Sequence, residues 1–328
     1  MSTESINVLM THPMSEECMR QIRATSPKII LRDVSEWVAA ERKGDFSFAR
    51  QLDNLLAETE VIYGEWPPLN IIARAPKLKW IQNIRAGMNR FTDPALVQSS
   101  VVLINFPHGT PVGEFAIHLM LVLAKQASLS FQLKQAKQWG SFTPALLESK
   151  TVGILGLGNV GKKVAKVAKA FDMKVVVMEI KHLARARYVD VLLPPDRLPE
   201  LLAESDFVVV TLPLTPETEK LIGEEALRTM KPTAYLINIA RGPIVDEAAL
   251  TRALDEHWIA GAGLDVFATE PLPADSRLWG LPNVVLSPHV AGKMVNYNEM
   301  ATELLCENLR RYLSGLKLLH VVDMRRGY

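Results

Sequence analysis

The chain has 328 residues, 37 Lys and Arg against 36 Asp and Glu, and 48% hydrophobic residues. This composition excludes a disordered or fibrous chain, and the length predicts two domains. The net charge of +1 provides no basic field, so we expect neither nucleic acid nor a membrane as a partner.

The predicted strands are short apolar runs rich in Val and Ile, which alternate with longer stretches of helical period. This alternation is typical of parallel sheets covered on both faces, and hence of an α/β fold. Two sheets are expected, because eleven strands would make one sheet unusually wide. The runs are Val8–Met10, Ile29–Leu31, Val61–Tyr63, Trp80–Ile84, Val101–Asn105, Thr151–Leu155, Lys174–Met178, Phe207–Leu212, Tyr235–Ile239, Gly263–Val266 and Val284–Ser287.

Two long helices are predicted from their start and stop signals. Thr110-Pro111 opens a helical stretch that extends to about Gln138, and a Thr before Pro at the first helical position is a good helix start. A second periodic helix is expected from about Tyr297 to about Leu313, with Ser314-Gly315 as its stop.

The cellular location is predicted from the N-terminus and the cysteines. The opening residues, MSTESINVLM, have no basic segment followed by an apolar one, so we expect no signal peptide. Cys18 and Cys306 are too few for a disulfide framework or a Cys-rich metal site. A cytoplasmic protein without a metal is therefore expected.

Residues 151–161 read TVGILGLGNVG, a strand that leads into a G-x-G-x-x-G loop and a helical stretch. Gly156 permits the tight turn, Gly158 lets the backbone approach a pyrophosphate, and Gly161 lets the helix pack closely on the strand. The N-terminus of the helix offers free N–H groups to the phosphates. The spacing alone is a weak signal, but the flanking strands and helix indicate a Rossmann dinucleotide site.

A carboxylate, Glu179, ends the next strand, KVVVM. There it can accept hydrogen bonds from the adenosine ribose and repel a 2′-phosphate, which favours NAD over NADP. Basic and imidazole side chains follow at once, and they either reach a 2′-phosphate or form a solvated helix face, so NADP is not excluded. These residues are Lys181, His182, Arg185 and Arg187.

Three later strands end in residues suited to proton transfer and anion binding. Carboxyl ends of parallel strands meet at one edge of a sheet, so these residues should face the same crevice as the glycine loop. His289 can exchange a proton near neutral pH, as hydride transfer to a carbonyl requires. Glu270 can orient that ring, and Arg241 can hold a carboxylate in a two-pronged contact. The alternatives are a structural histidine and ordinary surface ion pairs.

Three long segments carry a resemblance to a known family: LPLTPETEKLIGEEALRTMKPTAYLINIARGPIVDEAAL (212–250), GLDVFATEPLP (263–273) and LSPHVAG (286–292). Together with NVLMTHPMSEE, LKWIQNIRAGMNRF and NLRRYLSGLKLLHVVD, they resemble the D-isomer-specific 2-hydroxyacid dehydrogenases over nearly the whole chain. The resemblance implies an enzyme that transfers a hydride between NAD(H) and C2 of a small 2-oxo or D-2-hydroxy acid, and a homodimer.

The resemblance also implies roles for individual residues. His289 matches the catalytic histidine, Glu270 the acid that raises its basicity, and Arg241 the arginine that binds the substrate carboxylate and carbonyl oxygen. The turn Arg85-Ala86-Gly87 matches one whose backbone N–H groups bind the substrate carboxylate. The cofactor positions are Gly156, Gly158, Asn159, Val160, Gly161, Glu179, Leu212, Ile239 and Asp265, of which the last matches a residue near the nicotinamide carboxamide.

Two of the departures from the family pattern concern the substrate site. Arg85 replaces a small residue, and it either adds a cation at the carboxylate site or points outward. The segment Lys293-Met294-Val295-Asn296-Tyr297 replaces the more frequent small and hydroxyl residues, which leaves the size and polarity of the substrate pocket open.

For the fold, the resemblance implies a doubly wound Rossmann domain inserted into a smaller, flavodoxin-like α/β substrate domain. Residues 1–104 and 291–328 are expected to form the substrate domain, and residues 105–290 the NAD-binding domain. Glyoxylate, hydroxypyruvate and larger 2-oxoacids all remain open as substrates. Two other functions also remain open: an NAD-sensing, corepressor-like binding protein, and a formate or phosphite type of dehydrogenase on the same fold.

Overall fold

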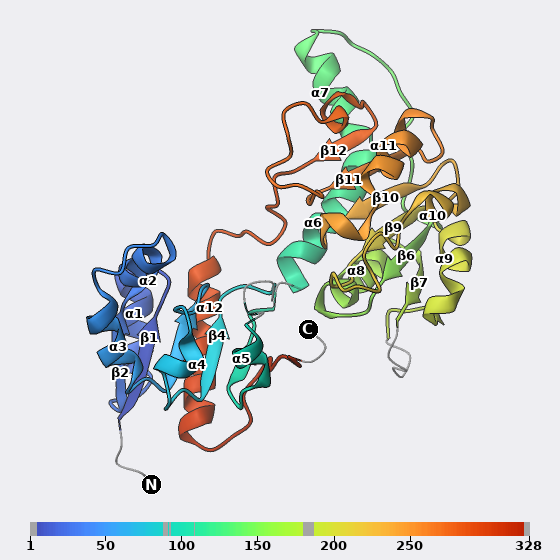
Figure 1. Cartoon of the computed structure of the whole chain (residues 1–328). Coiled ribbons are helices and arrows are strands. Elements are labelled where there is room, and N and C mark those ends of the chain that lie inside the picture. The colour runs from blue at the N-terminus through green and yellow to red at the C-terminus, as the bar shows by residue number, and fades with distance from the viewer. Residues whose placement is uncertain (1–4, 88–90, 92, 108, 180–186, 325–328) are drawn as a thin grey trace. The chain divides into compact units, whose positions relative to one another are not determined.

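A computed structural model describes residues 5–87, 91, 93–107, 109–179 and 187–324 (Figure 1). The chain divides into two compact units: unit 1 is Met1–Pro107 with Met294–Tyr328, and unit 2 is His108–Lys293. The chain passes from unit 1 to unit 2 and back, and both crossings lie three residues beyond the boundaries expected from the sequence.

Unit 1 contains a five-stranded parallel sheet in the order β2-β1-β3-β4-β5, which is the flavodoxin-like order. Its strands are β1 (Ile6–Met10), β2 (Ile29–Asp33), β3 (Val61–Gly64), β4 (Trp80–Asn83) and β5 (Val102–Ile104). The helices that accompany it are α1 (Glu16–Ala24), α2 (Ser35–Arg42), α3 (Ala49–Leu56), α4 (Ile71–Arg74), α5 (Pro94–Gln98) and α12 (Tyr297–Leu313).

Helix α12 joins unit 1 although it lies almost 200 residues after β5 in the chain. Its buried residues Ala301, Leu305 and Leu309 belong to the same hydrophobic cluster as β1 and β3. In addition, the buried Asn308 donates from Nδ2 to Oε1 of Gln82 on β4, at 3.0 Å. These contacts explain why the chain returns to its first domain.

Unit 2 contains a seven-stranded parallel sheet in the order β12-β11-β10-β9-β6-β7-β8. The order reverses between β6 and β9, as in dinucleotide-binding folds. The strands are β6 (Thr151–Leu155), β7 (Lys174–Met178), β8 (Val191–Leu193), β9 (Phe207–Val210), β10 (Tyr235–Asn238), β11 (Gly261–Leu264) and β12 (Val284–Leu286).

Helices cover both faces of this sheet. On β7, Val175 and Val177 join a cluster with α6 (Gly109–Ala124) and α8 (Asn159–Ala170), whereas Val176 and Met178 face the other side. Side chains alternate between the faces of a strand, so this strand is apolar throughout because both of its faces are buried. The second face is covered by α9 (Leu198–Glu204), α10 (Glu224–Thr229) and α11 (Glu247–Asp255).

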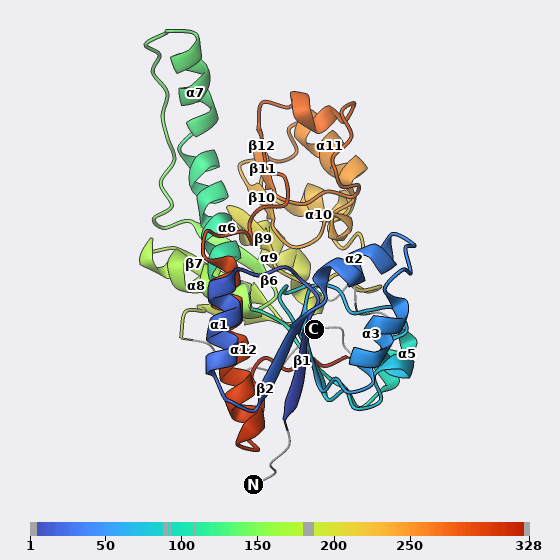
Figure 2. The ribbon, with the colours of Figure 1, turned by 90° about the vertical axis from the view of Figure 1, so that its left-hand side faces the viewer.

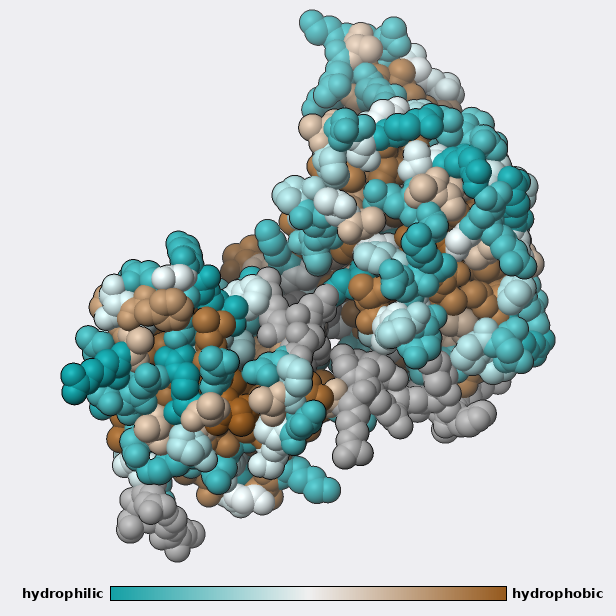
Figure 3. Space-filling model, in the orientation of Figure 1, coloured by the Kyte–Doolittle hydropathy of each residue, from teal (hydrophilic) through white to brown (hydrophobic). Residues whose placement is uncertain are grey.

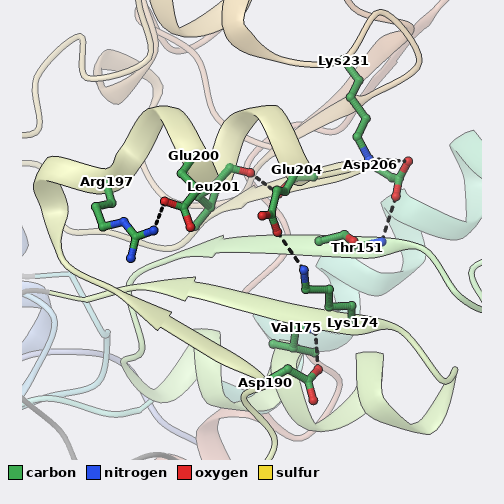
Figure 4. A network of polar contacts seen from close by, with 11 residues as sticks. Thr151, Lys174, Val175, Asp190, Arg197, Glu200, Leu201, Glu204, Asp206 and Lys231 are labelled. Atoms are coloured by element: carbon green, nitrogen blue, oxygen red, sulfur yellow. Dashed lines mark hydrogen bonds and ion pairs between the residues drawn. The ribbon is translucent and has the colours of Figure 1, made fainter.

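Ion pairs and hydrogen bonds hold the amino ends of these strands (Figure 4). Asp206, just before β9, accepts a hydrogen bond from the backbone N–H of Thr151 at 2.8 Å and pairs with Lys231 at 3.2 Å. Lys174 at the start of β7 pairs with Glu204 of α9 at 2.8 Å. Ligands of parallel α/β sheets bind at the opposite edge, where the carboxyl ends of the strands lie.

All eleven predicted strands are present, with bounds shifted by at most two residues. Strand β8 was not predicted, because it has only three residues and Val191 and Leu192 are only partly buried. The single helix predicted from Pro111 to Gln138 was wrong, since it is two helices, α6 and α7 (Ala127–Gln135), at 61° to each other. Gln126 between them has φ 51°, a left-handed conformation that ends a right-handed helix.

Among the described residues, no single helix is long and apolar enough to cross a membrane. Only the bent pair α6 and α7, taken together, has the length and apolar composition of a membrane span.

Candidate active site

The glycine loop lies between β6 and α8, at the carboxyl edge of the unit 2 sheet. Gly156 has φ +98°, which a side chain would strain. A Cβ on Gly161 would lie 2.1 Å from the Gly156 carbonyl oxygen, whereas a Cβ on Gly158 would meet nothing within 4 Å. The fold of the loop therefore requires glycine at Gly156 and Gly161. Gly158 instead leaves open space at the N-terminus of α8, where Asn159 and Val160 form the first turn.

Glu179 comes directly after β7 and reaches the glycine loop. Its Oε2 accepts a hydrogen bond from the backbone N–H of Leu157 at 2.7 Å. The carboxylate is therefore next to the loop, as the ribose-binding prediction requires. Of the basic segment that follows, Lys181, His182 and Arg185 lie outside the described residues, and Arg187 is exposed.

The remaining predicted cofactor residues of strands β9 and β10 are buried at the same edge. Leu212 is packed so closely on the loop that its Cδ2 would be 3.0 Å from a Cβ on Gly156. Ile239 directly follows β10 and is also buried. Sequence reasoning missed Thr211, whose Oγ1 donates to the carbonyls of Leu155 and Gly156 at 2.9 and 2.8 Å and so braces the turn.

His289 and Glu270 form a direct pair. Nδ1 of His289 lies 2.7 Å from Oε2 of Glu270, and the other Glu270 oxygen accepts the backbone N–H of Phe267 at 3.0 Å. Glu270 is thus held by its own loop while it holds the ring. Because Nδ1 faces the carboxylate, Nε2 is the ring nitrogen left for another proton acceptor or donor.

Asp265 holds the turn that carries His289. Its side chain is 1% exposed and accepts three hydrogen bonds: Oδ1 from Ser287 Oγ at 2.6 Å and from the N–H of Val290 at 2.9 Å, and Oδ2 from the N–H of Ala291 at 2.9 Å. Its carbonyl also accepts the N–H of His289 at 2.9 Å. Since His289 has φ 50°, an unfavourable conformation for most residues, this bracing keeps the histidine in place.

Asp265→Asn is expected to lower kcat by about tenfold or more, because an amide places an N–H against an N–H of the turn and displaces His289. Steady-state kinetics and thermal unfolding of the variant, with Ser287→Ala as the milder change, measure this effect. An unchanged kcat together with a raised KM for the cofactor would instead identify Asp265 as a nicotinamide contact only.

Arg241 follows β10. In the sheet, β11 lies between β10 and β12. Nη1 of Arg241 donates to the carbonyl of Ala240 at 2.6 Å, which is the one hydrogen-bond partner of the guanidinium among the described residues. Burial lowers the pKa of Arg241, and the negative charge of Glu270 opposes that shift. A desolvated cation of this kind is stabilised by an anionic ligand.

The Arg241 and Glu270 loops pack directly on each other. A Cβ on Gly242 would lie 1.9 Å from the backbone carbon of Phe267, so only glycine allows this approach. The buried Asn238, which sequence reasoning missed, holds the Arg241 turn by donating to the Arg241 carbonyl at 3.1 Å and accepting the Ala240 N–H at 3.1 Å. The structure thus brings the three predicted catalytic side chains to one sheet edge.

The turn Arg85-Ala86-Gly87 lies in unit 1, after β4. Asn83 donates to the Gly87 carbonyl at 3.0 Å, and Asn105 donates to the Ala86 carbonyl at 3.1 Å. Among the described residues, the N–H groups of Ala86 and Gly87 have no partner, which suits an anion. The Arg85 side chain neither stands alone nor points freely outward, because it pairs with Glu65 at 3.3 Å.

No three His, Cys, Asp or Glu side chains in the described part of the chain are grouped so that they could hold a metal ion.

Known proteins match this chain over most of its length. Residues 117–291 match the family model described as "D-isomer specific 2-hydroxyacid dehydrogenase, NAD binding domain". The chain is 38% identical to a glyoxylate reductase of Thermofilum pendens over 253 residues, which is 75% of each protein. It is 39% identical to a glyoxylate/hydroxypyruvate reductase B of Pectobacterium carotovorum over 276 residues, 79% of this chain and 84% of that one.

Solved structures of this family also match the chain, over 99% of its length. A D-isomer specific 2-hydroxyacid dehydrogenase from Xanthobacter autotrophicus, in complex with NADPH and MES, matches with a TM-score of 0.83 and 30% identity over 99% of this chain and 100% of that one. An NADPH-dependent glyoxylate/hydroxypyruvate reductase from Sinorhizobium meliloti matches with a TM-score of 0.79 and 26% identity over 99% and 100%. The chain therefore belongs to the D-isomer specific 2-hydroxyacid dehydrogenase family.

Proposed function

We propose that this protein is an NADH-dependent reductase of small 2-oxoacids of the glyoxylate and hydroxypyruvate type. As a member of its family, it transfers a hydride between a nicotinamide cofactor and C2 of a 2-oxo or 2-hydroxy acid. The observation that carries the proposal is the 2.7 Å contact of His289 with Glu270, at the sheet edge that also holds Arg241 and the glycine loop.

The residues of unit 2 fit a nicotinamide dinucleotide. Gly158 and the first turn of α8, Asn159 to Gly161, would bind the pyrophosphate through backbone N–H groups. Glu179 would bind the adenosine ribose, and Leu212 and Ile239 would contact the cofactor at the ends of their strands. When bound, the reduced cofactor supplies the hydride.

The chain's own side chains supply binding and proton transfer. In unit 2, Arg241 is suited to bind a substrate carboxylate. In unit 1, the N–H groups of Ala86 and Gly87 are also suited to bind a carboxylate. In reduction, Nε2 of His289 gives a proton to the 2-oxo oxygen, and in oxidation it takes that proton back. Glu270 orients the ring through Nδ1 and provides the counter-charge for its protonated form. In this proposal unit 1 is the substrate domain and unit 2 the NAD-binding domain.

The cofactor preference is testable at Glu179. Glu179→Gln keeps the acceptor for the Leu157 N–H but removes the charge that repels a 2′-phosphate, so we expect the preference for NADH over NADPH to narrow about five- to tenfold. The ratio of kcat/KM for the two cofactors measures this. The matched control is Glu204→Gln on α9, whose carboxylate pairs with Lys174 at the amino end of β7. It should leave the ratio unchanged. A wild-type preference for NADPH would assign cofactor choice to the segment from Lys181 to Arg187 instead.

We also propose a cytoplasmic homodimer that binds neither nucleic acid nor a membrane. The arm formed by α7 and residues 136–147 extends from the rest of unit 2 (Figure 2), and α7 has no buried residue. Large apolar side chains on this arm are exposed, namely Phe131, Trp139 and Leu146, and hydrophobic surface is interspersed with hydrophilic surface there (Figure 3). A second copy of the chain would cover these side chains.

The decisive experiment measures NADH and NADPH oxidation with glyoxylate, hydroxypyruvate and larger 2-oxoacids. We expect turnover with at least the small 2-oxoacids. Tight NADH binding without turnover of any 2-oxoacid would favour the sensor function, and NAD reduction by formate or phosphite would favour the third alternative.

A further inference from the structure

Three side chains that the proposed mechanism does not use lie at the carboxyl ends of neighbouring strands in unit 1. His12 follows β1, Glu65 follows β3, and Arg85 follows β4. In the sheet, β2 lies on one side of β1 and β3 lies on the other side. The direction in which successive strands are added therefore reverses between β1 and β3. Ligands of open α/β sheets bind at the carboxyl ends of the strands at such a reversal.

One oxygen of Glu65 is shared by the two nitrogen-bearing side chains. Its Oε2 lies 3.3 Å from Nη2 of Arg85 and 3.8 Å from Nδ1 of His12. The Glu65 side chain is 13% exposed and that of Arg85 39%. Burial, aided by the Arg85 cation and opposed by Asp33, lowers the pKa of His12, so His12 is neutral at pH 7. The cluster then carries no net charge.

The Arg85 guanidinium is held in position but keeps unused donor capacity. Its Cζ lies 5.2 Å from the ring centroid of Tyr297, and the Tyr297 hydroxyl donates to the carbonyl of Ile84. Within the described part of the chain, Nε of Arg85 is buried without a hydrogen-bond partner. Buried donors normally have partners, so this arrangement is suited to a polar group from a ligand.

We propose that His12, Glu65 and Arg85, here called the polar triad, bind a hydroxyl group on C3 of the substrate. This inference rests on the proposed function, in which the Ala86 and Gly87 N–H groups beside Arg85 bind the substrate carboxylate. The triad therefore makes the enzyme select hydroxypyruvate over pyruvate.

The chemistry of the triad favours a hydroxyl over other substituents. A hydroxyl can donate to Glu65 and accept from Arg85 at the same time. A second carboxylate would be repelled by Glu65. A methyl group could not accept a hydrogen bond from Arg85, whose Nε has no partner among the described residues. Sites built to bind a hydroxyl discriminate strongly against analogues that lack one.

The test compares kcat/KM for glyoxylate, pyruvate and hydroxypyruvate in the wild type and in Glu65→Gln. We expect the wild type to have a higher kcat/KM for hydroxypyruvate than for pyruvate. In Glu65→Gln the ratio of these two values should fall about tenfold. Glyoxylate has no C3, so the substitution should lower kcat/KM for glyoxylate less than it lowers kcat/KM for hydroxypyruvate. The control is Glu60→Gln, just before the amino end of β3, where Oε2 accepts from the Tyr312 hydroxyl at 3.1 Å; its preference should equal that of the wild type.

Arg85→Gln is the second variant, and it should lower the hydroxypyruvate preference in the same direction. Equal losses on all three substrates, or an unchanged preference in both variants, would overturn the inference while leaving the proposed function intact. Failure of the wild type to reduce any 2-oxoacid would overturn the proposed function itself, so the two failures are distinguishable.

Discussion

His289→Asn is expected to lower kcat for 2-oxoacid reduction by about 10²- to 10⁴-fold, the usual contribution of a positioned acid or base. Asparagine is the appropriate replacement, because His289 has φ 50° and Asn tolerates the left-handed region better than Ala. The turn held by Asp265 should then stay intact, and only proton transfer is removed. Single-turnover kinetics with pre-bound NADH separate the chemical step from binding.

The chain offers a matched control for this variant in His257. It is an exposed histidine with φ 55° after α11 in the same unit, and the proposed mechanism gives it no role. His257→Asn should keep the wild-type kcat. If His289→Asn retained more than about a tenth of the wild-type kcat, another group would have to supply the proton, and the central role proposed for the His289–Glu270 pair would be wrong.

Arg241→Lys is the second substitution with a large expected effect. Lysine keeps the positive charge but cannot form the two-pronged contact of a guanidinium with a carboxylate. Loss of one hydrogen bond to a charged group costs about 1.5–3 kcal/mol, which predicts a fall in kcat/KM for the 2-oxoacid of about 10- to 150-fold. The KM for NADH should change little, because Arg241 is proposed to contact the substrate and not the cofactor.

Arg252→Lys is the corresponding control, since Arg252 is an exposed arginine that pairs with Glu224 on the surface of unit 2. Arg252→Lys should leave kcat/KM for the 2-oxoacid and the KM for NADH as in the wild type. A variant Arg241→Lys with unchanged kcat/KM for every 2-oxoacid would show that the carboxylate is bound by other groups, and the backbone turn Arg85-Ala86-Gly87 would be the first to test.

The bracing of the proposed catalytic groups was harder to predict than the groups themselves. His289, Glu270 and Arg241 were proposed because each follows a recognisable strand and belongs to a long motif. Ser287 and Asn238 gave no such signal, since a serine or an asparagine at a strand end is common in turns of many kinds. Their roles depend on which loop lies opposite, and therefore on the order of the strands in the sheet.

The Arg85 side chain illustrates the same limit in unit 1. From the sequence, a cation at the carboxylate site and an outward-pointing side chain were equally open. The structure shows a third arrangement, in which Glu65 from the neighbouring strand and Tyr297 from α12 hold the guanidinium. Neither neighbour could be inferred from local sequence, because β3 and α12 reach Arg85 only through the folded chain.

The sequence by itself determined the features that depend on nearby residues. Apolar runs predicted the strands, stop signals gave the end of the helix Tyr297–Leu313, and glycine spacing placed the dinucleotide loop, because backbone conformation and burial periodicity are largely local. Only the tertiary structure decided the break at Gln126, the bracing of His289 by Asp265 and the polar triad. These depend on packing between segments distant in the chain, which decides which of several locally acceptable conformations and partners has the lowest free energy.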